Sequence, residues 1–543
     1  MPKVEKEFDY IIVGGGSAGC VLAHRLTESE DVSVLLVESG GSDWHPYIKI
    51  PGAYLKLFRT RMDWQFWTEP QTHVGNRKIY LPRGKTLGGS SSTNAMAYVR
   101  GNHRDYDEWA ELGNTGWGYE DVLPYFLKSE NNEQAELLDP GYHQQGGPLH
   151  VSFQHRFKTP FAAAFVESGK SLGLPENKDY NGKSQEGIGK FQFTIKNGVR
   201  HSAASAFLKP ARQRPNLAIQ THCTVSSIEL AGDRARSISV IRKGQHQVFH
   251  SAREIILSAG SFGSPQLLML SGIGDPDELS KHGISVKHSI PGVGKNLQDH
   301  LFFPISATSP LRKGFNHFIP WHQQLLAMLN FLIFRQGPFT ASILEAVAFL
   351  NPEDFSKPAN FQFHFGPTQL GKDYSKDKYD IRNFPTSPDG FTILPSLLKP
   401  QSRGSVSLHS SHPTDAPRID PCFLAEPADL QKLIQGGKVA YELLNQKAME
   451  QVSPNILSPG DPRNDNDWIQ HIRSSLETIY HPVGTCKMGT DSMAVVDPEL
   501  KVHGLTGLRV VDASIMPTII TGNTNAPVYM IAEKAADMIK DAT

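Results

Sequence analysis

Short apolar runs alternate with glycine-rich turns along the chain, and the first forty residues show this pattern most clearly. Residues 10–13 form a β-branched run that predicts a buried strand, and a second buried strand is predicted over 32–37. Between them, the glycine-rich segment 14–19 leads into apolar positions at helical spacing that end at Leu26. The order strand, glycine turn, helix, strand is typical of an α/β domain with a parallel sheet.

The glycine turn has the G-x-G-x-x-G spacing of a dinucleotide-binding motif. Gly14 suits the tight turn, Gly16 lets the backbone approach a pyrophosphate, and Gly19 lets the helix pack close to the strand. Ser17 stands at the expected helix start, where free amides attract phosphate. Glu38 ends the second strand, where a carboxylate accepts a hydrogen bond from a ribose 2′-hydroxyl and disfavours a 2′-phosphate.

Two rival motifs compete with the dinucleotide site, one at the same residues and one further along the chain. Residues 15–19 also fit G-x-S-x-G, the nucleophile elbow of α/β-hydrolases, with Ser17 as nucleophile. That interpretation leaves Glu38 without a role, and nothing upstream supplies oxyanion donors. Residues 84–86 end like a phosphate-binding P-loop, but Ile79 stands where its first glycine belongs. The dinucleotide site is therefore the favoured interpretation.

Small residues gather at two later places. The segment 84–96 includes Gly88, Gly89 and Asn94, and its amides and hydroxyls suit a second polar part of a cofactor, although a flexible surface loop has the same composition. A strand predicted over 254–259 leads into the glycine-rich segment 260–274, where Pro265 is expected in the first turn of a helix.

The C-terminal region carries candidate chemistry. His481 precedes a proline, which disfavours helical conformation and favours display of the side chain from a turn, although most histidines are structural. A strand over 507–511 then ends in Asp512 and Ala513. A helix is predicted after the segment 521–527, and Asn525 lies near its start, where it either caps the helix or points at a ligand.

Length and charge narrow the class of protein. A chain of 543 residues predicts two or more domains, or one large composite. Because 54 Lys and Arg face 55 Asp and Glu, no overall field favours nucleic acid, and no apolar run is long enough to span a bilayer. The four cysteines lie far apart, which predicts neither a disulfide framework nor a metal site. With a mixed-charge N-terminus, the expected location is a reducing cytoplasm.

Four signatures, in this order, resemble the glucose–methanol–choline family of flavin oxidoreductases: the glycine turn at 14–19, Gly88 and Gly89 with Asn94, the segment 260–274, and the C-terminal segments with His481 and Asn525. The resemblance extends from about residue 8 to 540, and it is strongest to the choline dehydrogenase and aliphatic alcohol dehydrogenase branch. It implies an α/β fold in which a Rossmann-like FAD-binding domain is interleaved with a sheet-based substrate domain. We expect the FAD-binding domain at 1–155, 215–300 and 480–543, and the substrate domain at 156–214 and 301–479.

The resemblance also implies a reaction. It is the FAD-dependent oxidation of a primary alcohol to an aldehyde, with hydride transfer to flavin N5 and a quinone or O2 as electron acceptor. His481 matches the base, and Asn525 matches the second catalytic position at a helix start that faces the flavin. The residues implied at the cofactor are Gly14, Gly16, Ser17, Gly19, Glu38, Gly88, Gly89, Asn94, Val225, Asp512, Ala513 and Asn525. Thr93 stands where some members link FAD through a histidine, so we expect non-covalent FAD.

Several alternatives stay open at this point. Glu345 and Tyr480 would suit choline through charge and cation–π contact, although a paired glutamate and a packed tyrosine fit the sequence equally well. A flavin-dependent lyase or photodecarboxylase on the same fold has no need of the His481 and Asn525 pair. The apolar stretch 321–334 would lie at a membrane surface, for example in peripheral contact with the inner membrane face, flank an apolar channel, or form a buried helix.

Overall fold

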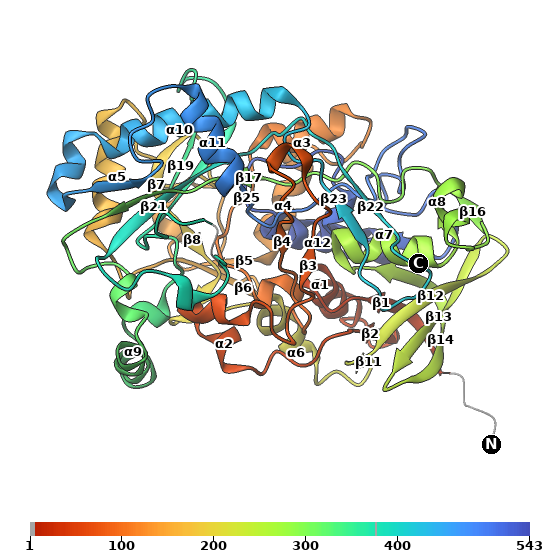
Figure 1. Cartoon of the computed structure of the whole chain (residues 1–543). Helices are drawn as coiled ribbons and strands as arrows, with labels where there is room; N and C mark the ends of the chain where they lie inside the picture. The colour runs from red at the N-terminus through yellow and green to blue at the C-terminus, as the bar shows by residue number, and fades with distance from the viewer. Residues whose placement is uncertain (1–5, 375–376, 543) are drawn as a thin grey trace.

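The computed structural model describes residues 6–374 and 377–542, and within them two large sheets dominate the fold (Figure 1). The first is a seven-stranded sheet in the order β11–β2–β1–β14–β13–β12, with β26 beside β14. Its strands are β1 (Lys6–Val13), β2 (Val34–Val37), β11 (Leu217–Gln220), β12 (Thr224–Ala231), β13 (Arg234–Arg242), β14 (Gln245–Leu257) and β26 (Leu508–Val510). The neighbours of β1, namely β2 and β14, run parallel to it, as the sequence predicted for the first α/β unit.

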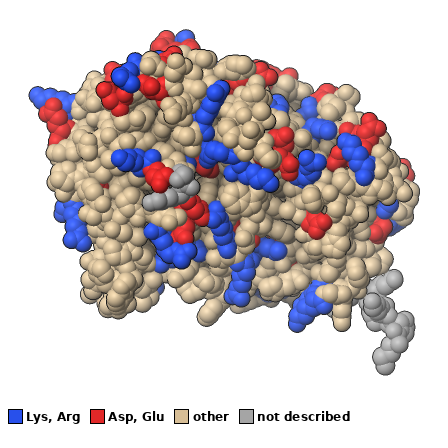
Figure 2. Space-filling model, in the orientation of Figure 1, with Lys and Arg blue, Asp and Glu red and all other residues tan. Residues whose placement is uncertain are grey.

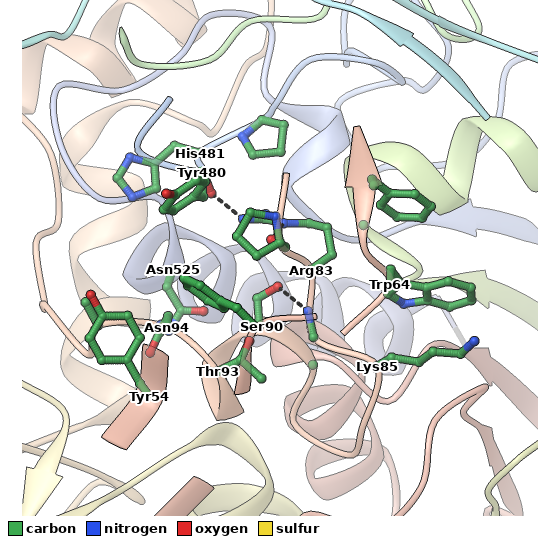
Figure 3. A pocket seen from close by; sticks show the side chains of 18 of the residues that line it. Tyr54, Trp64, Arg83, Lys85, Ser90, Thr93, Asn94, Tyr480, His481 and Asn525 are labelled. Atoms are coloured by element: carbon green, nitrogen blue, oxygen red, sulfur yellow. Dashed lines mark hydrogen bonds between the residues drawn. The ribbon is translucent and has the colours of Figure 1, made fainter. Parts of the chain in front are cut away.

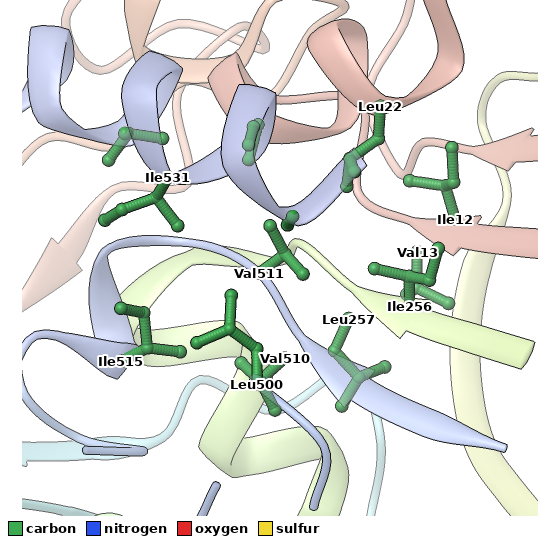
Figure 4. Packing of buried hydrophobic residues seen from close by; sticks show 14 of the residues in the cluster. Ile12, Val13, Leu22, Ile256, Leu257, Leu500, Val510, Val511, Ile515 and Ile531 are labelled. Atoms are coloured by element: carbon green, nitrogen blue, oxygen red, sulfur yellow. The ribbon is translucent and has the colours of Figure 1, made fainter. Parts of the chain in front are cut away.

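Aliphatic side chains fill the space between this sheet and the helices on it. Ile12 of β1, Ile256 of β14 and Val510 of β26 are fully buried with Leu22 of helix α1 (Ser17–Leu26) and Ile531 of α12 (Asn525–Asp541) (Figure 4). Each such side chain contributes about 1.5–3 kcal/mol on burial. Within this core α1 packs on α12, and Ser17 at the start of α1 donates to Asn525 at the start of α12, so the first and last segments of the chain lie together beside the sheet.

The second sheet has eight strands, in the order β24–β18–β21–β20–β19–β7, with β17 between β21 and β25. Its strands are β7 (Gly187–Lys190), β17 (Leu301–Phe302), β18 (Ile305–Thr308), β19 (Ala346–Leu350), β20 (Phe361–Gly366), β21 (Gly390–Leu397), β24 (Asn455–Ser458) and β25 (Glu477–Thr478). Neighbouring strands are antiparallel, and helices α5 (Pro160–Ser171) and α10 (Pro427–Leu444) pack on one face around buried Phe361, Phe363 and Phe365 (Figure 1).

Small sheets and further helices complete the chain. The small sheets pair β3 (Phe66–Trp67) with β4 (Tyr80–Leu81), β5 (Glu130–Asn132) and β8 (Gln192–Phe193) with β6 (Leu149–Phe153), β9 (Ile195–Lys196) with β10 (Val199–Arg200), β15 (Ile273–Gly274) with β16 (His288–Ser289), and β22 (Ser405–Ser407) with β23 (Arg418–Asp420). The other helices are α2 (Pro46–Lys49), α3 (His103–Glu111), α4 (Tyr119–Ser129), α5 (Pro160–Ser171), α6 (Lys209–Ala211), α7 (Gly260–Leu270), α8 (Pro276–Lys281), α9 (Trp321–Phe334), α10 (Pro427–Leu444) and α11 (Asp465–Ser475).

Helix α7 begins earlier than expected, which changes the position of Pro265 within it. The helix begins at Gly260, so Pro265 lies inside it and not in its first turn. A proline at this position leaves the carbonyl of Ser261 without its usual amide donor. The hydroxyl of Thr485 donates to that carbonyl at 2.6 Å, which satisfies the carbonyl and lets the helix continue through the proline.

Helix α9 bears on the three alternatives left open for residues 321–334, and it does not fit the buried helix. An apolar stretch of its composition is typical of a buried helix, yet Ala327 and Phe331 are its only buried residues. In Figure 1 the helix projects from the lower left of the molecule. Among residues 6–374 and 377–542, no helix has both the length and the hydrophobicity needed to cross a membrane.

Candidate active site

A cavity of about 600 Å³, part of whose wall is drawn in Figure 3, is lined from both large sheets. Its wall includes Val225 of β12 and His364 of β20. Most residues singled out in the sequence lie in its wall: Gly14, Gly16, Ser17, Glu38, Gly89, Asn94, Val225, Tyr480, His481, Asp512, Ala513 and Asn525. The described residues of the wall do not include Gly19, Gly88 or Glu345. The cavity thus joins the N-terminal glycine turn to the C-terminal histidine.

The glycine turn is tightly packed at two of its three motif glycines and open at the third. Gly14 has a φ of +104°, and a Cβ there would lie 2.3 Å from the carbonyl oxygen of Ser258. A Cβ at Gly19 would lie 1.9 Å from the carbonyl oxygen of Gly14, so only glycine allows this contact between helix and turn. At Gly16 the nearest atom to a Cβ, the Ser258 oxygen, is 3.8 Å away, so this position faces open space. Helix α1 starts there with no side-chain cap, which leaves its first amides available to an anion.

Glu38 closes the same end of the cavity. Its two carboxylate oxygens accept from the backbone N–H of Gly15 at 2.8 Å and of Gly40 at 2.7 Å. Burial raises the pKa of this carboxyl to about 7, against the opposing effect of these two hydrogen bonds. The contacts hold β2 and the glycine turn in register, and the side chain lies at the cavity wall, where a ribose hydroxyl is expected.

The second small-residue segment packs directly on the first. The amide of Gly88 donates to the carbonyl of Gly15 at 2.7 Å, and a Cβ on Gly89 would come within 2.7 Å of the Cα of Gly16. The side-chain oxygen of Asn94 accepts from buried Arg200 at 2.8 Å. Close backbone packing therefore explains the two glycines, and the arginine fixes how Asn94 faces the cavity.

These features fit FAD. Two helix N-termini, those of α1 and α12, meet at the cavity, and neither carries a side-chain cap. The buried hydroxyl of Ser258, a residue of the wall, has no hydrogen-bond partner among the described residues. An orphaned polar atom at a glycine-lined cavity is the arrangement expected where a polar ligand completes the site. Asp512 braces it by accepting from Gly260 N at 2.9 Å and Ser264 Oγ at 2.6 Å.

His481 is held by its backbone, which leaves its ring for the cavity. Its amide donates to the carboxylate of Asp299 at 2.8 Å, and Thr478 Oγ1 donates to the same carboxylate at 2.5 Å. The preceding residue, Tyr480, has a φ of +68°, and its carbonyl accepts from Arg83 at 2.6 Å (Figure 3). A non-glycine residue at this φ is strained, and these surrounding hydrogen bonds hold it in place.

A chain of hydrogen bonds sets the tautomer of His481. His300 Nε2 lies 3.0 Å from the carbonyl of Ile520, and a carbonyl only accepts, so this nitrogen carries the proton. Burial lowers the pKa of His300 to about 3, so its Nδ1 is an unprotonated acceptor. His481 Nδ1 lies 3.0 Å from it and must donate. The lone pair of His481 is therefore on Nε2.

Asn523 is the side chain that meets this lone pair. Its Nδ2 lies 3.1 Å from His481 Nε2, and its Oδ1 accepts from Gln362 Nε2 of β20 at 3.1 Å, which fixes the orientation of the amide. Asn525, two residues on, accepts from the hydroxyl of Ser17 at 2.7 Å at the junction of α1 and α12. The structure thus brings Asn523 to His481, and it brings Asn525 to the glycine turn.

The hydrogen bond between Ser17 and Asn525 argues against the hydrolase interpretation of residues 15–19. A serine nucleophile needs a neighbouring base to take its proton. Ser17 donates its hydrogen bond to the amide oxygen of Asn525, which is not a base. This geometry gives Ser17 a structural role at the two helix starts.

Glu345 and Tyr480, the two residues expected to bind a quaternary ammonium group, have different surroundings. Glu345 is buried, and its carboxylate accepts from the backbone N–H of Thr159 at 2.8 Å and from its hydroxyl at 2.7 Å. Tyr480 lies in the wall, with its ring centroid 6.2 Å from that of Phe58 and 6.3 Å from that of Tyr379. The aromatic cluster is therefore at the cavity, and Glu345 is engaged elsewhere.

Sequence reasoning missed several residues around His481. They are His300, Asp299, Arg83, His364 and Asn523. Asn523 lies in the same short segment as Asn525, so that segment already contained the signal. The others approach His481 from distant parts of the chain, and a single sequence holds no signal for such contacts.

Comparison with known proteins shows the family. Models of GMC oxidoreductases match residues 8–302 and 400–532. The oxygen-dependent choline dehydrogenase of Sinorhizobium fredii is 42% identical over 98% of this chain and 95% of its own. The alcohol dehydrogenase (acceptor) of Pseudomonas putida is 41% identical over the same shares. The chain belongs to the GMC oxidoreductase family, which confirms the expectation from its motifs.

A solved structure agrees with this assignment. A formate oxidase variant from Aspergillus oryzae RIB40, studied for the modification of its FAD, superposes with a TM-score of 0.91 at 29% identity and covers 99% of this chain and 98% of its own. The α/β fold predicted from the sequence is thus confirmed. The protein is a flavin-dependent oxidoreductase.

Proposed function

We propose that this protein oxidises a neutral primary alcohol with an apolar chain to the aldehyde, with FAD as its cofactor. The observation that carries the proposal is the unprotonated Nε2 of His481, which lies 3.1 Å from an amide donor in a cavity whose other end is lined by glycines. When bound, FAD supplies the acceptor for the hydride that leaves the alcohol carbon.

Each residue then has one task. His481 Nε2 takes the hydroxyl proton, and Asn523 Nδ2 donates to the oxygen as alkoxide character develops. Asn525, which we expected in that second role, is proposed instead to hold the start of α12 on the cofactor side, through Ser17. Gly14, Gly16 and Glu38 bind the dinucleotide end.

We also propose the division into an FAD-binding part, at 1–155, 215–300 and 480–543, and a substrate part, at 156–214 and 301–479. The two sheets support it, because all strands of the seven-stranded sheet fall in the first set of ranges and all strands of the eight-stranded sheet fall in the second. In this arrangement the substrate part contributes Gln362, which orients Asn523.

A neutral substrate is favoured by the charges near Tyr480. Arg83 and Lys378 lie in the cavity wall. Glu477, a carboxylate of the wall, is already paired with Arg77 at 2.8 Å and Lys378 at 3.4 Å. A quaternary ammonium group placed there would meet cations and a neutralised carboxylate. Choline nevertheless remains the alternative, because of the likeness to choline dehydrogenase and the aromatic ring of Tyr480.

Two alcohols of the same shape separate these substrates. Choline and 3,3-dimethylbutan-1-ol differ only in the charge of the branched group. We expect the neutral alcohol to bleach the flavin absorbance of the anaerobic enzyme at a concentration at least about tenfold lower than choline requires. This factor corresponds to about 1.4 kcal/mol in binding free energy. A tenfold preference for choline would overturn the neutral assignment, and bleaching by neither would favour the lyase or photodecarboxylase alternative. The rate at which absorbance returns on admission of air distinguishes O2 from a quinone as acceptor.

Release of the cofactor is a second prediction. Thr93 lies in the cavity wall, and a hydroxyl group there lacks the imidazole nitrogen that forms the covalent link in some family members. We therefore expect acid precipitation to leave essentially all of the flavin in the supernatant, as measured by its absorbance. Yellow colour that stays with the precipitated protein would show a covalent bond and contradict this assignment.

We place the protein in a reducing cytoplasm. The support is that Cys20, Cys223, Cys422 and Cys486 are all free thiols, three of them buried. Recovery of the protein from the cytoplasmic side after cell fractionation is the relevant measurement, and recovery from an oxidising compartment would contradict it.

A further inference from the structure

The outer face of helix α9 is an apolar patch open to solvent. Trp321 is 78% exposed, Ile333 66% and Phe334 67%. Leu325, Leu326, Leu329 and Leu332 are exposed as well. Monomeric proteins rarely expose contiguous apolar surface of this kind unless it binds something.

The helix is fixed to the body of the protein, so its exposed face has a defined direction. Ala327 and Phe331 pack against Ile50, Ala53 and Phe339 on the inner side. Lys56 also donates to the side chain of Gln324. A patch held in this way is a built surface and not a loose end.

The two chain segments that form and support the patch contain basic residues and no acidic ones. The segments 44–62 and 310–344 contain no Asp or Glu, although the whole chain has a formal charge of −1. Their basic residues are Lys49, Lys56, Arg59, Arg61, Arg312, Lys313 and Arg335. Lys49 and Arg59 pair with Asp43 and Asp377, which lie outside the two segments. Figure 2 shows the corner that holds α9 as tan, with Lys and Arg beside it.

We propose that this basic apolar face, formed by α9 and the segments 44–62 and 310–344, docks on the surface of an anionic lipid bilayer. The apolar side chains of α9 enter the interface, and Trp44, which is 85% exposed, lies in the segment 44–62 as an additional interfacial anchor. The cations face lipid phosphates. A second copy of the chain is a poorer occupant, because a two-fold contact sets the same excess of cations against itself: of the seven basic residues, Lys49 and Arg59 are paired with carboxylates, and the two segments contain no Asp or Glu.

The cavity extends to the inner side of this face. Phe318 and Phe339, which pack with α9, and Gln324 of the helix itself are also residues of the cavity wall. An apolar molecule dissolved in the bilayer would thus meet the cavity at the docked face. This consequence rests on the proposed function, whereas docking itself does not.

Sedimentation with vesicles tests the docking. The FAD-loaded full-length protein is mixed with phosphatidylcholine vesicles that contain phosphatidylglycerol, or with phosphatidylcholine alone. We expect binding to the anionic vesicles that weakens as salt is raised. The double variant Leu326→Gln/Ile333→Gln should bind at least about tenfold more weakly. The matched control is Leu137→Gln/Val248→Gln, at positions 80% and 45% exposed outside the two segments, which should bind like the wild type.

The outcomes are decisive in both directions. Wild-type protein that stays in the supernatant with anionic vesicles overturns the proposal, as does a Leu326→Gln/Ile333→Gln variant that binds unchanged. A wild-type dimer that this variant dissociates, without vesicle binding, assigns the face to a second copy instead. Fluorescence gives an independent readout: a lipid-borne quencher should reduce the emission of wild-type protein more than that of Trp321→Phe. Circular dichroism and flavin absorbance verify that each variant is folded and loaded.

Discussion

Replacing His481 by alanine is expected to lower kcat/KM for the alcohol by a factor of about one hundred or more, while the flavin content stays that of the wild type. The reason is that Nε2 of His481 carries the unprotonated lone pair in the chain His300, His481, Asn523, and without it no group at that position takes the hydroxyl proton. The measurement is steady-state kinetics together with the ratio of flavin to protein absorbance.

The control for this variant is His471→Ala. His471 and His481 are equally exposed, at 9%, but the His471 ring contacts the carbonyl of Pro304 and the hydroxyl of Ser458. The two variants should therefore lose similar stability, and only His481→Ala should lose turnover. Near-full activity of His481→Ala would remove this histidine from the mechanism and leave the FAD site intact.

The pH profile follows from the same environment. Burial, with the nearby His300, His364 and Arg83, lowers the pKa of His481 well below its ordinary value of 6.5. A base must be unprotonated to act, so a lowered pKa moves the acid limb of kcat/KM to lower pH. We expect activity to be flat near about pH 7 and to fall only below pH 6.5. In His481→Ala this limb should disappear from the residual rate.

The sequence predicted the parts of the site that depend on neighbours along the chain. The turn at Gly14, the carboxylate of Glu38 and the turn that displays His481 each follow from a few adjacent residues. His300 was not predictable, because it reaches His481 across 181 positions through the pairing of β17 with β25. Local pattern does not encode such pairing.

The sequence alone did not indicate which of the two asparagines, Asn523 or Asn525, contacts His481. Asn525 is the first residue of α12, and Asn523 precedes the helix. Successive residues at a helix start point in different directions, so a shift of two positions decides which side chain meets His481. The sequence likewise left open whether α9 is exposed or buried, since its composition suits a core helix as well as a surface one. What covers a helix face is decided by the rest of the fold.

Substitution of alanine for Gly16 is expected to abolish FAD binding in an apoprotein that folds normally. Gly16 has a φ of −76°, which any residue adopts, and its added Cβ has no neighbour closer than 3.8 Å. The methyl group would therefore occupy space that faces the cavity at the start of α1, where the backbone must approach a pyrophosphate. We expect flavin occupancy below about a tenth of the wild type, a loss of at least about 1.4 kcal/mol in binding.

Gly14→Ala is the matched comparison, because this substitution is expected to lower the stability of the fold itself and not only the binding of FAD. With a φ of +104° and a Cβ 2.3 Å from the oxygen of Ser258, alanine at position 14 strains the backbone whether or not FAD is present. Thermal unfolding of the two apoproteins should therefore differ, with Gly16→Ala close to the wild-type apoprotein and Gly14→Ala clearly lower. A Gly16→Ala protein that retains FAD with wild-type affinity would mean that no pyrophosphate lies against this turn, and the cofactor would have to bind elsewhere in the cavity.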